Sequence, residues 1–125
     1  DDFKKINDDH GHTFGDLVLK TAVKMIEKRI RSTDVFARWG GEEFLILFPD
    51  TAVDKAVVIA EELRQQLSQL AVPRVGHITA SFGVAGYTPG DTVDTLIQKA
   101  DKLMYEAKAA GRNHVRYDQE TVFPS

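Results

Sequence analysis

The feature that most constrains the fold is a pair of adjacent glycines, Gly40 and Gly41, set between two short apolar segments. Residues 35–39 and 44–48 are rich in aliphatic and aromatic side chains, a composition typical of β-strands. Glycine adopts positive φ angles at both central positions of a tight turn at little cost. The pattern therefore predicts a β-hairpin whose tip is formed by these two glycines.

Two carboxylates, Glu42 and Glu43, follow directly after the predicted hairpin tip. Neighbouring side chains of a strand point to opposite faces, so the two acids cannot share one role. Glycines that let a phosphate approach the backbone, beside carboxylates that hold Mg²⁺, would form a site for a nucleoside triphosphate. The alternative from these residues alone is an ordinary hairpin with two solvated acids.

The remainder of the chain alternates predicted helices with predicted strands. Apolar side chains at helical spacing predict amphipathic helices over about residues 15–31, 51–70 and 92–110. Asp50 or Thr51 is expected to cap the second helix, and Gly111 to follow the third as its C′ residue. Pro73 interrupts the pattern, and strands are expected over residues 78–85 and 114–117. Periodicity alone therefore predicts a single α/β domain.

Composition excludes several classes of function. The net charge is −3, so there is no excess of Lys and Arg to neutralise a polyphosphate backbone, and nucleic acid is not the expected main partner. The chain has no cysteine, which excludes disulfides and thiolate zinc sites. No apolar run approaches the roughly 20 residues of a membrane span, so we expect no membrane contact by this segment.

Four blocks of sequence carry a resemblance to one family. In chain order they are Phe3-Lys4-x-Ile6-Asn7-Asp8 with Gly11-His12, Gly15-Asp16 and Leu19; Gly40-Gly41-Glu42-Glu43-Phe44; Ser81-Phe82-Gly83-Val84-Ala85; and Ala100-Asp101 with Met104-Tyr105-x-Ala107-Lys108 and Gly111-Arg112-Asn113. In order and spacing they resemble the GGDEF family, the bacterial diguanylate cyclases, in its Gly-Gly-Glu-Glu-Phe form. The blocks cover almost the whole chain, so chance agreement is not a reasonable explanation.

The resemblance implies an α/β fold similar to the palm of adenylyl cyclases, with a mainly antiparallel central sheet flanked by helices. It implies a GGDEF domain over residues 1–118, followed by a tail over residues 119–125. In the family pattern an N-terminal helix and a first strand come before the position of Asp1. We therefore expect this chain to be an N-terminally truncated segment of a longer protein.

The resemblance also implies an enzyme, a diguanylate cyclase that condenses two GTP into cyclic di-GMP and two pyrophosphates. Glu42 is then a catalytic metal ligand, for Mg²⁺ or Mn²⁺. Glu43 is then a catalytic residue that contacts a second metal ion or accepts the hydroxyl proton. The other metal-binding aspartate of the family falls two residues before Asp1, and Asp1 occupies the place of a second aspartate that does not bind metal.

Asn7 and Asp16 are the residues that the resemblance assigns to guanine. A carboxylate can accept both N–H donors on the Watson–Crick edge of guanine, so Asp16 favours GTP over ATP. From the residues alone, Asn7 is a turn residue and Asp16 is a helix cap or a first-turn acid.

The resemblance assigns Lys4, Lys108 and Arg112 to the phosphates, with Phe3 contributing backbone N–H groups there. Lys108 and Arg112 are four residues apart, so they share one face if the helix extends that far. The alternative from their spacing is that both cations offset the dipole at a helix C-terminus.

Arg31-Ser32-Thr33-Asp34 matches the R-x-x-D inhibitory motif of the family, at the family's spacing from Gly40. Arginine can bind guanine or a phosphate in a forked manner while aspartate accepts the guanine N–H donors. Arg31 and Asp34 are thus expected to form an allosteric site for the product. The alternative is a simple ion pair at a helix end, worth about 0.5 kcal/mol or less.

The expected partners are GTP, cyclic di-GMP and a second copy of the domain, because one domain cannot present two GTP molecules in opposed orientation. An upstream sensor or regulatory domain would control this homodimer. The domain is expected in the bacterial cytoplasm, with any membrane anchor in segments outside this chain. The alternative function is a catalytically silent GGDEF module that binds GTP or cyclic di-GMP to regulate a partner domain.

Overall fold

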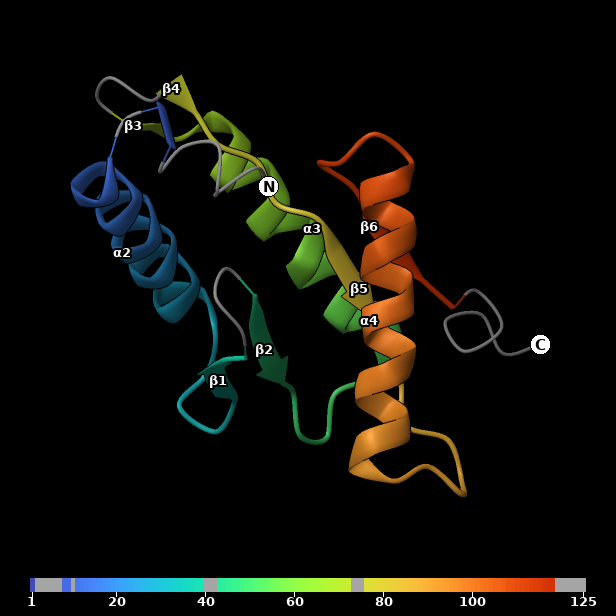
Figure 1. Cartoon of the computed structure of the whole chain (residues 1–125). Helices are drawn as coiled ribbons and strands as arrows, with labels where there is room; N and C mark the ends of the chain where they lie inside the picture. The colour runs from blue at the N-terminus through green and yellow to red at the C-terminus, as the bar shows by residue number, and fades with distance from the viewer. Residues whose placement is uncertain (2–7, 10, 40–42, 73–75, 119–125) are drawn as a thin grey trace.

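The computed structural model describes residues 1, 8–9, 11–39, 43–72 and 76–118. Three long helices and six short strands make up this part of the chain (Figure 1). They follow one another as α2 (His12–Arg29), β1 (Val35–Arg38), β2 (Phe44–Leu47), α3 (Val53–Gln69), β3 (Ala71–Val72), β4 (Gly76–His77), β5 (Phe82–Val84), α4 (Val93–Ala109) and β6 (Val115–Tyr117). The predicted α/β class is confirmed.

The strands form three two-stranded sheets rather than one continuous central sheet. β1 pairs with β2 and β3 with β4, both antiparallel. β5 pairs with β6 in parallel, because the chain crosses over through α4 between these two strands. Within the described residues, the expected single sheet is therefore divided, and one of its pairs is parallel.

The predicted hairpin is confirmed in its two strands. Val35 lies opposite Leu47, and Arg38 lies opposite Phe44. Beyond the last pair, the Trp39 N–H donates to the carbonyl of Glu43 at 2.9 Å. Gly40, Gly41 and Glu42 lie outside the described residues.

Of the two expectations for helix ends, the cap of α3 is wrong and the glycine after α4 is confirmed. Neither Asp50 nor Thr51 caps α3: its N-cap is Ala52, without a side-chain hydrogen bond, and Asp50 instead takes a left-handed turn with φ of 53°. α4 begins after Thr92, whose side chain exchanges hydrogen bonds with Thr95 in a capping box. Gly111 follows the C-cap of α4 with φ of 115°, so the prediction of a C′ glycine is confirmed.

The core is formed where α2 and α3 pack against the segment that leads into β5. Val18, Leu67 and Ile78 form its buried cluster. α3 buries one face, as its apolar spacing predicted, through Ala56, Ala60, Leu63 and Leu67. The strand expected over residues 78–85 is shorter, because only Phe82–Val84 pairs with a neighbour.

Candidate functional site

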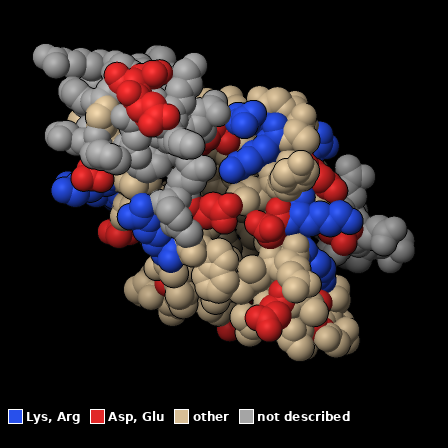
Figure 2. All heavy atoms as spheres, viewed as in Figure 1, with Lys and Arg blue, Asp and Glu red and all other residues tan. Residues whose placement is uncertain are grey.

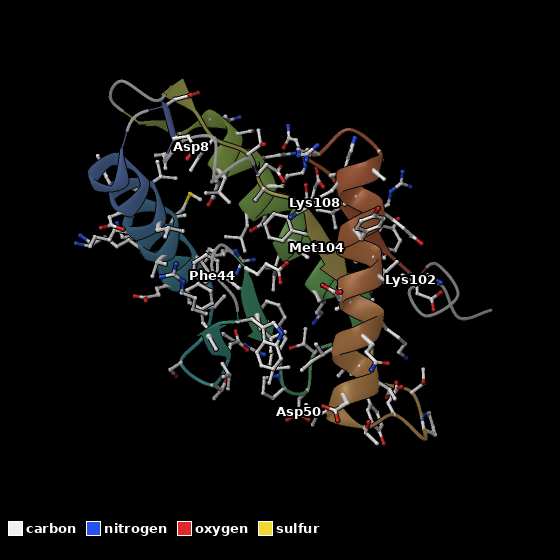
Figure 3. The ribbon with its side chains drawn as sticks, in the orientation of Figure 1. Asp8, Phe44, Asp50, Lys102, Met104 and Lys108 are labelled. Atoms are coloured by element: carbon white, nitrogen blue, oxygen red, sulfur yellow. The ribbon has the colours of Figure 1, made fainter. Side chains whose placement is uncertain are left out.

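An open cavity of about 630 Å³ lies between β2 and the segment that contains β5. Most of its lining is apolar and comes from the two strands and the three helices, with Ile26, Leu63 and Met104 among the contributors. Charged side chains at its wall include Asp1, Glu43 and Lys108. Figure 3 shows Met104 and Lys108 on the side of α4 that faces β5, whereas Lys102 lies on the opposite side. The cavity thus brings together ionisable groups from three distant parts of the chain.

The carboxylate of Asp1 is held by several donors. The hydroxyls of Ser81 and Thr79 donate to its two oxygens, each at 2.8 Å. The backbone N–H of Asn113 donates to Oδ2 at 3.1 Å, and the amino group of Asp1 donates to the Thr79 carbonyl at 2.8 Å. Asp1 therefore contacts both the segment that leads into β5 and the loop after α4.

Lys108 and Arg112 lie at and beyond the C-terminal end of α4. Lys108 is in the last turn and half-buried, and Arg112 is exposed. The helix does not extend to Arg112, which adopts a left-handed φ of 62° after Gly111. Lys108 and Arg112 therefore do not share one face of the helix. A cation in the last turn stabilises the helix dipole, so the dipole alternative still applies to Lys108.

Asp16 is exposed and lies in the second turn of α2. The N-cap of this helix is Gly11, and the first turn contains no acid. The alternative in which Asp16 is a helix cap or first-turn acid is therefore wrong. Asn7, the other residue assigned to guanine, lies outside the described residues, as do Phe3, Lys4 and Glu42.

Arg31 and Asp34 are paired with each other just after α2. The backbone N–H of Arg31 donates to Asp34 Oδ2 at 2.8 Å, and its Nη2 donates to Oδ1 at 3.2 Å. Nη2 also donates to the carbonyl of Pro49 and, at 2.7 Å, to the hydroxyl of Thr51. Burial acts to raise the pKa of Asp34, but the hydrogen bonds from Arg31 outweigh it, so this pKa is lowered. The carboxylate stays ionised and is covered, whereas the Arg31 side chain is 58% exposed.

Two further features bear on ligands. Across the described ranges, no group of three or more His, Asp or Glu side chains lies close enough to hold a metal ion. No helix found there is long and apolar enough to cross a membrane. Figure 2 shows basic and acidic side chains interspersed on the face it displays.

Several residues in contact with Asp1 or with the loop after α4 were not predicted as functional. Thr79, Ser81, Asn113 and Arg64 form contacts around Asp1 and the loop after α4. Ser81 and Asn113 fall inside the quoted family blocks, so membership in those blocks was the available signal. Thr79 and Arg64 carry no local signal.

Comparison with known proteins identifies the family. The model of the diguanylate cyclase GGDEF domain matches residues 1–114. The chain is 39% identical over 115 residues to the diguanylate cyclase DgcM of Escherichia coli, covering 92% of this chain and 28% of that protein. It therefore spans less than a third of the length of this relative.

Two solved structures are also similar. One is the GGDEF domain of DgcB from Caulobacter crescentus in complex with c-di-GMP, with a TM-score of 0.90, 34% identity, and coverage of 94% of this chain and 72% of that chain. The other is the active GGEEF domain of a diguanylate cyclase from Vibrio cholerae, with a TM-score of 0.89, 33% identity, and coverage of 100% and 79%. From its sequence and its fold alike, this chain belongs to the GGDEF family of diguanylate cyclase domains.

Proposed function

We propose that the chain is the catalytic domain of a diguanylate cyclase, which converts two GTP into cyclic di-GMP and two pyrophosphates. One observation carries the proposal. Glu43, Lys108 and Asp1 line one open cavity although they come from the hairpin, the end of α4 and the N-terminus. An acidic group and a basic group at one cavity are what nucleotidyl transfer requires, because a proton must leave a hydroxyl and a triphosphate must be neutralised.

Two copies of the domain face each other, and each holds one GTP. The 3′-hydroxyl of each GTP attacks the α-phosphorus of the other. A bond forms between the 3′-oxygen and this phosphorus, and the bond to the bridging oxygen of the β-phosphate breaks. Pyrophosphate leaves with the bond's electron pair. Glu43 is the candidate acceptor of the hydroxyl proton, or contacts a metal ion. The two-fold arrangement makes a homodimer necessary.

Substrate binding is divided among several segments. Asn7 and Asp16 recognise guanine; the exposed position of Asp16 on α2 supports a role in binding. Phe3, Lys4, Lys108 and Arg112 bind the phosphates. The exposure of Arg112 and the place of Lys108 in the cavity wall support this assignment.

The expected metal is Mg²⁺ or Mn²⁺, with Glu42 as its ligand in this chain. Carboxylate oxygens are the ligands that these hard cations prefer, so the donor chemistry of Glu42 and the neighbouring Glu43 fits them. The resemblance gives Asp1 no metal-binding role, and its oxygens accept hydrogen bonds from Ser81, Thr79 and Asn113. When bound, the metal polarises the 3′-hydroxyl and neutralises charge on the triphosphate.

Arg31 and Asp34 form a feedback site for cyclic di-GMP. The exposed guanidinium of Arg31 supports this role. Because the two side chains contact each other, product binding must compete with at least part of their ion pair.

The palm-like fold that the resemblance implies has a strand between β2 and β5. The cavity supports this arrangement, since both strands line it and, within the described residues, neither pairs across it. We propose that a strand preceding Asp1 fills the apolar part of this space in the natural protein, and that the charged side chains of Glu43 and Lys108 face the substrate beside that strand. Upstream segments then carry the regulatory domain. Because GTP is a cytoplasmic nucleotide, the domain works in the bacterial cytoplasm.

The test uses the full-length natural protein, GTP and Mg²⁺, with products identified by mass spectrometry. Cyclic di-GMP and pyrophosphate are expected in a ratio of about one to two, and ATP serves as the control substrate. Cyclic di-GMP binding without any turnover would instead support the silent regulatory module. Neither turnover nor binding of GTP or cyclic di-GMP would overturn both proposals.

A further inference from the structure

The loop after α4 has an unusual backbone conformation. Gly111, Arg112 and Asn113 are three consecutive residues with positive φ angles, of 115°, 62° and 52°. Glycine adopts such angles freely, but arginine and asparagine adopt them at a cost in backbone energy. A run of this kind persists only where surrounding contacts stabilise it, and such runs are concentrated at functional sites.

Asn113 is held from two sides by residues distant in the chain. Its backbone N–H donates to Oδ2 of Asp1 at 3.1 Å, across 112 residues of sequence. Its side-chain oxygen accepts a hydrogen bond from Nη1 of Arg64, on α3, at 3.1 Å. Beyond it, the carbonyl of His114 accepts a hydrogen bond from the N–H of Phe82 at 2.9 Å. The loop is thereby fixed to α3, to β5 and to the N-terminus.

The two groups that bind Asn113, the Asp1 carboxylate and the Arg64 guanidinium, are themselves held in place by neighbouring side chains. The hydroxyls of Thr79 and Ser81 donate to the Asp1 carboxylate. The guanidinium of Arg64 is paired with Glu61, one turn earlier on α3, and its side chain is only 20% exposed. Rigid support of this kind is what the positioning of a functional side chain requires.

We propose that Asp1 and Arg64 are positioning residues for Arg112, a role that rests on the function proposed above. By holding Asn113, they keep Arg112 in its left-handed conformation, four residues beyond Lys108. The Asp1 contact also fixes the loop after α4 to Thr79 and Ser81, whose hydroxyls donate to the same carboxylate as the Asn113 N–H.

The test compares affinities for two ligands in the full-length natural protein. One is a GTP analogue with a methylene bridge between the α- and β-phosphates, and the other is GMP, which lacks the terminal phosphates. In Asp1→Ala and Arg64→Met the analogue should bind about tenfold more weakly or worse, the loss expected for one charge-assisted hydrogen bond. GMP affinity should be unchanged.

Asp1→Asn is the conservative variant. Its amide oxygen can accept from Asn113 and Thr79 while its amide nitrogen donates to Ser81, so it should recover most of the analogue affinity. Lys99→Met is the matched control for Arg64→Met, because Lys99 is also a helix cation paired with an acid, Asp91, at 2.6 Å. It should bind both ligands as the parent does.

The outcomes separate this inference from the proposed function. If the parent bound neither ligand nor made product, the proposed function would fail, and the positioning role with it. If the parent bound the analogue but both variants lost GMP and analogue affinity equally, or lost neither, only the positioning role would be overturned. If Asp1→Ala failed to fold, Arg64→Met alone would decide, by whether it lost affinity for the GTP analogue while keeping its affinity for GMP.

Discussion

Gly83 in β5 lies against the backbone of Ala100 in α4, so closely that a Cβ atom added to the glycine would be 2.0 Å from the Ala100 carbonyl oxygen. The same atom would be 2.4 Å from the backbone nitrogen of Met104. Both obstacles are backbone atoms, which cannot move aside as a flexible side chain can. This contact explains why a residue without a side chain stands in the middle of the strand.

The first prediction is that Gly83→Ala lowers the free energy of unfolding by about 3 kcal/mol or more, at or above the upper end of typical overpacking costs. Urea denaturation measures this. Gly90→Ala is the control: its φ is 97°, but nothing lies within 4 Å of an added Cβ, so it should cost only about 1–2 kcal/mol. A Gly83→Ala variant as stable as Gly90→Ala would contradict the close packing of β5 on α4.

The second prediction concerns acid stability. The hydrogen bond from Lys99, with others from Thr88 and Thr95, holds the pKa of Asp91 far below its usual value. A carboxyl whose pKa is lower in the folded state stabilises the fold fully above its unfolded pKa, about 3.9, and this contribution is lost progressively as pH falls from there through the folded pKa. Lys99→Met should therefore reduce stability more at pH 6 than at pH 3, where part of the contribution has already been lost. Urea midpoints at both pH values measure this; equal losses at both would refute the assignment.

Local rules explain what could be predicted of the fold. The hairpin strands, the buried face of α3 and the C′ glycine follow from spacing and turn chemistry within a few residues. The two-residue strands β3 and β4 could not be predicted, because segments so short have no periodicity. The parallel pairing of β5 with β6 depends on the crossover through α4. Asp50 is a residue type that favours helix caps, but here it lies in a left-handed turn before α3.

The residues of the candidate site also fall into those that the sequence could name and those that it could not. Motif residues such as Asp16, Lys108 and Arg112 were named from the resemblance of their sequence blocks to the GGDEF family. Arg64 and Thr79 were not, because their roles arise from contacts with Asn113 and Asp1 across 49 and 78 residues. No pattern within a window of the sequence reports such contacts.

The third prediction is that Glu42→Gln abolishes cyclic di-GMP synthesis with little change in the urea midpoint, because it removes a charge from the metal site. Product formation by mass spectrometry and urea denaturation are the two measurements. Asp54→Asn, an exposed acid in the first turn of α3, is the control and should retain activity. Near-normal synthesis by Glu42→Gln would show that Glu42 is not the metal ligand.

The fourth prediction is that Asp16 selects guanine. Asp16→Ser should weaken the use of GTP by roughly 10²-fold or more, since donors left unpaired cost about 1–3 kcal/mol each. Competition between GTP and ATP measures the preference. Glu27→Ser removes another exposed acid of α2 and should leave it unchanged. If Asp16→Ser still preferred GTP as strongly as the parent, base recognition would lie elsewhere.

The fifth prediction is that Arg31→Ala relieves inhibition by cyclic di-GMP while the initial rate, measured before product accumulates, stays largely intact. Removing the guanidinium removes the group that would bind the product, and Arg31 lies outside the cavity lined by Glu43 and Lys108. Progress curves with and without added product, on the full-length natural protein, separate the two effects.

Arg29→Ala provides the matched control for Arg31. Arg29 lies two residues earlier and pairs with Glu62 at 2.5 Å, so its removal costs a similar surface ion pair but should leave product inhibition unchanged. A general loss of stability would lower the initial rate in both variants. If Arg31→Ala remained as sensitive to product as Arg29→Ala, then Arg31 and Asp34 would be no more than an ion pair after α2, with further hydrogen bonds from Arg31 to Pro49 and Thr51.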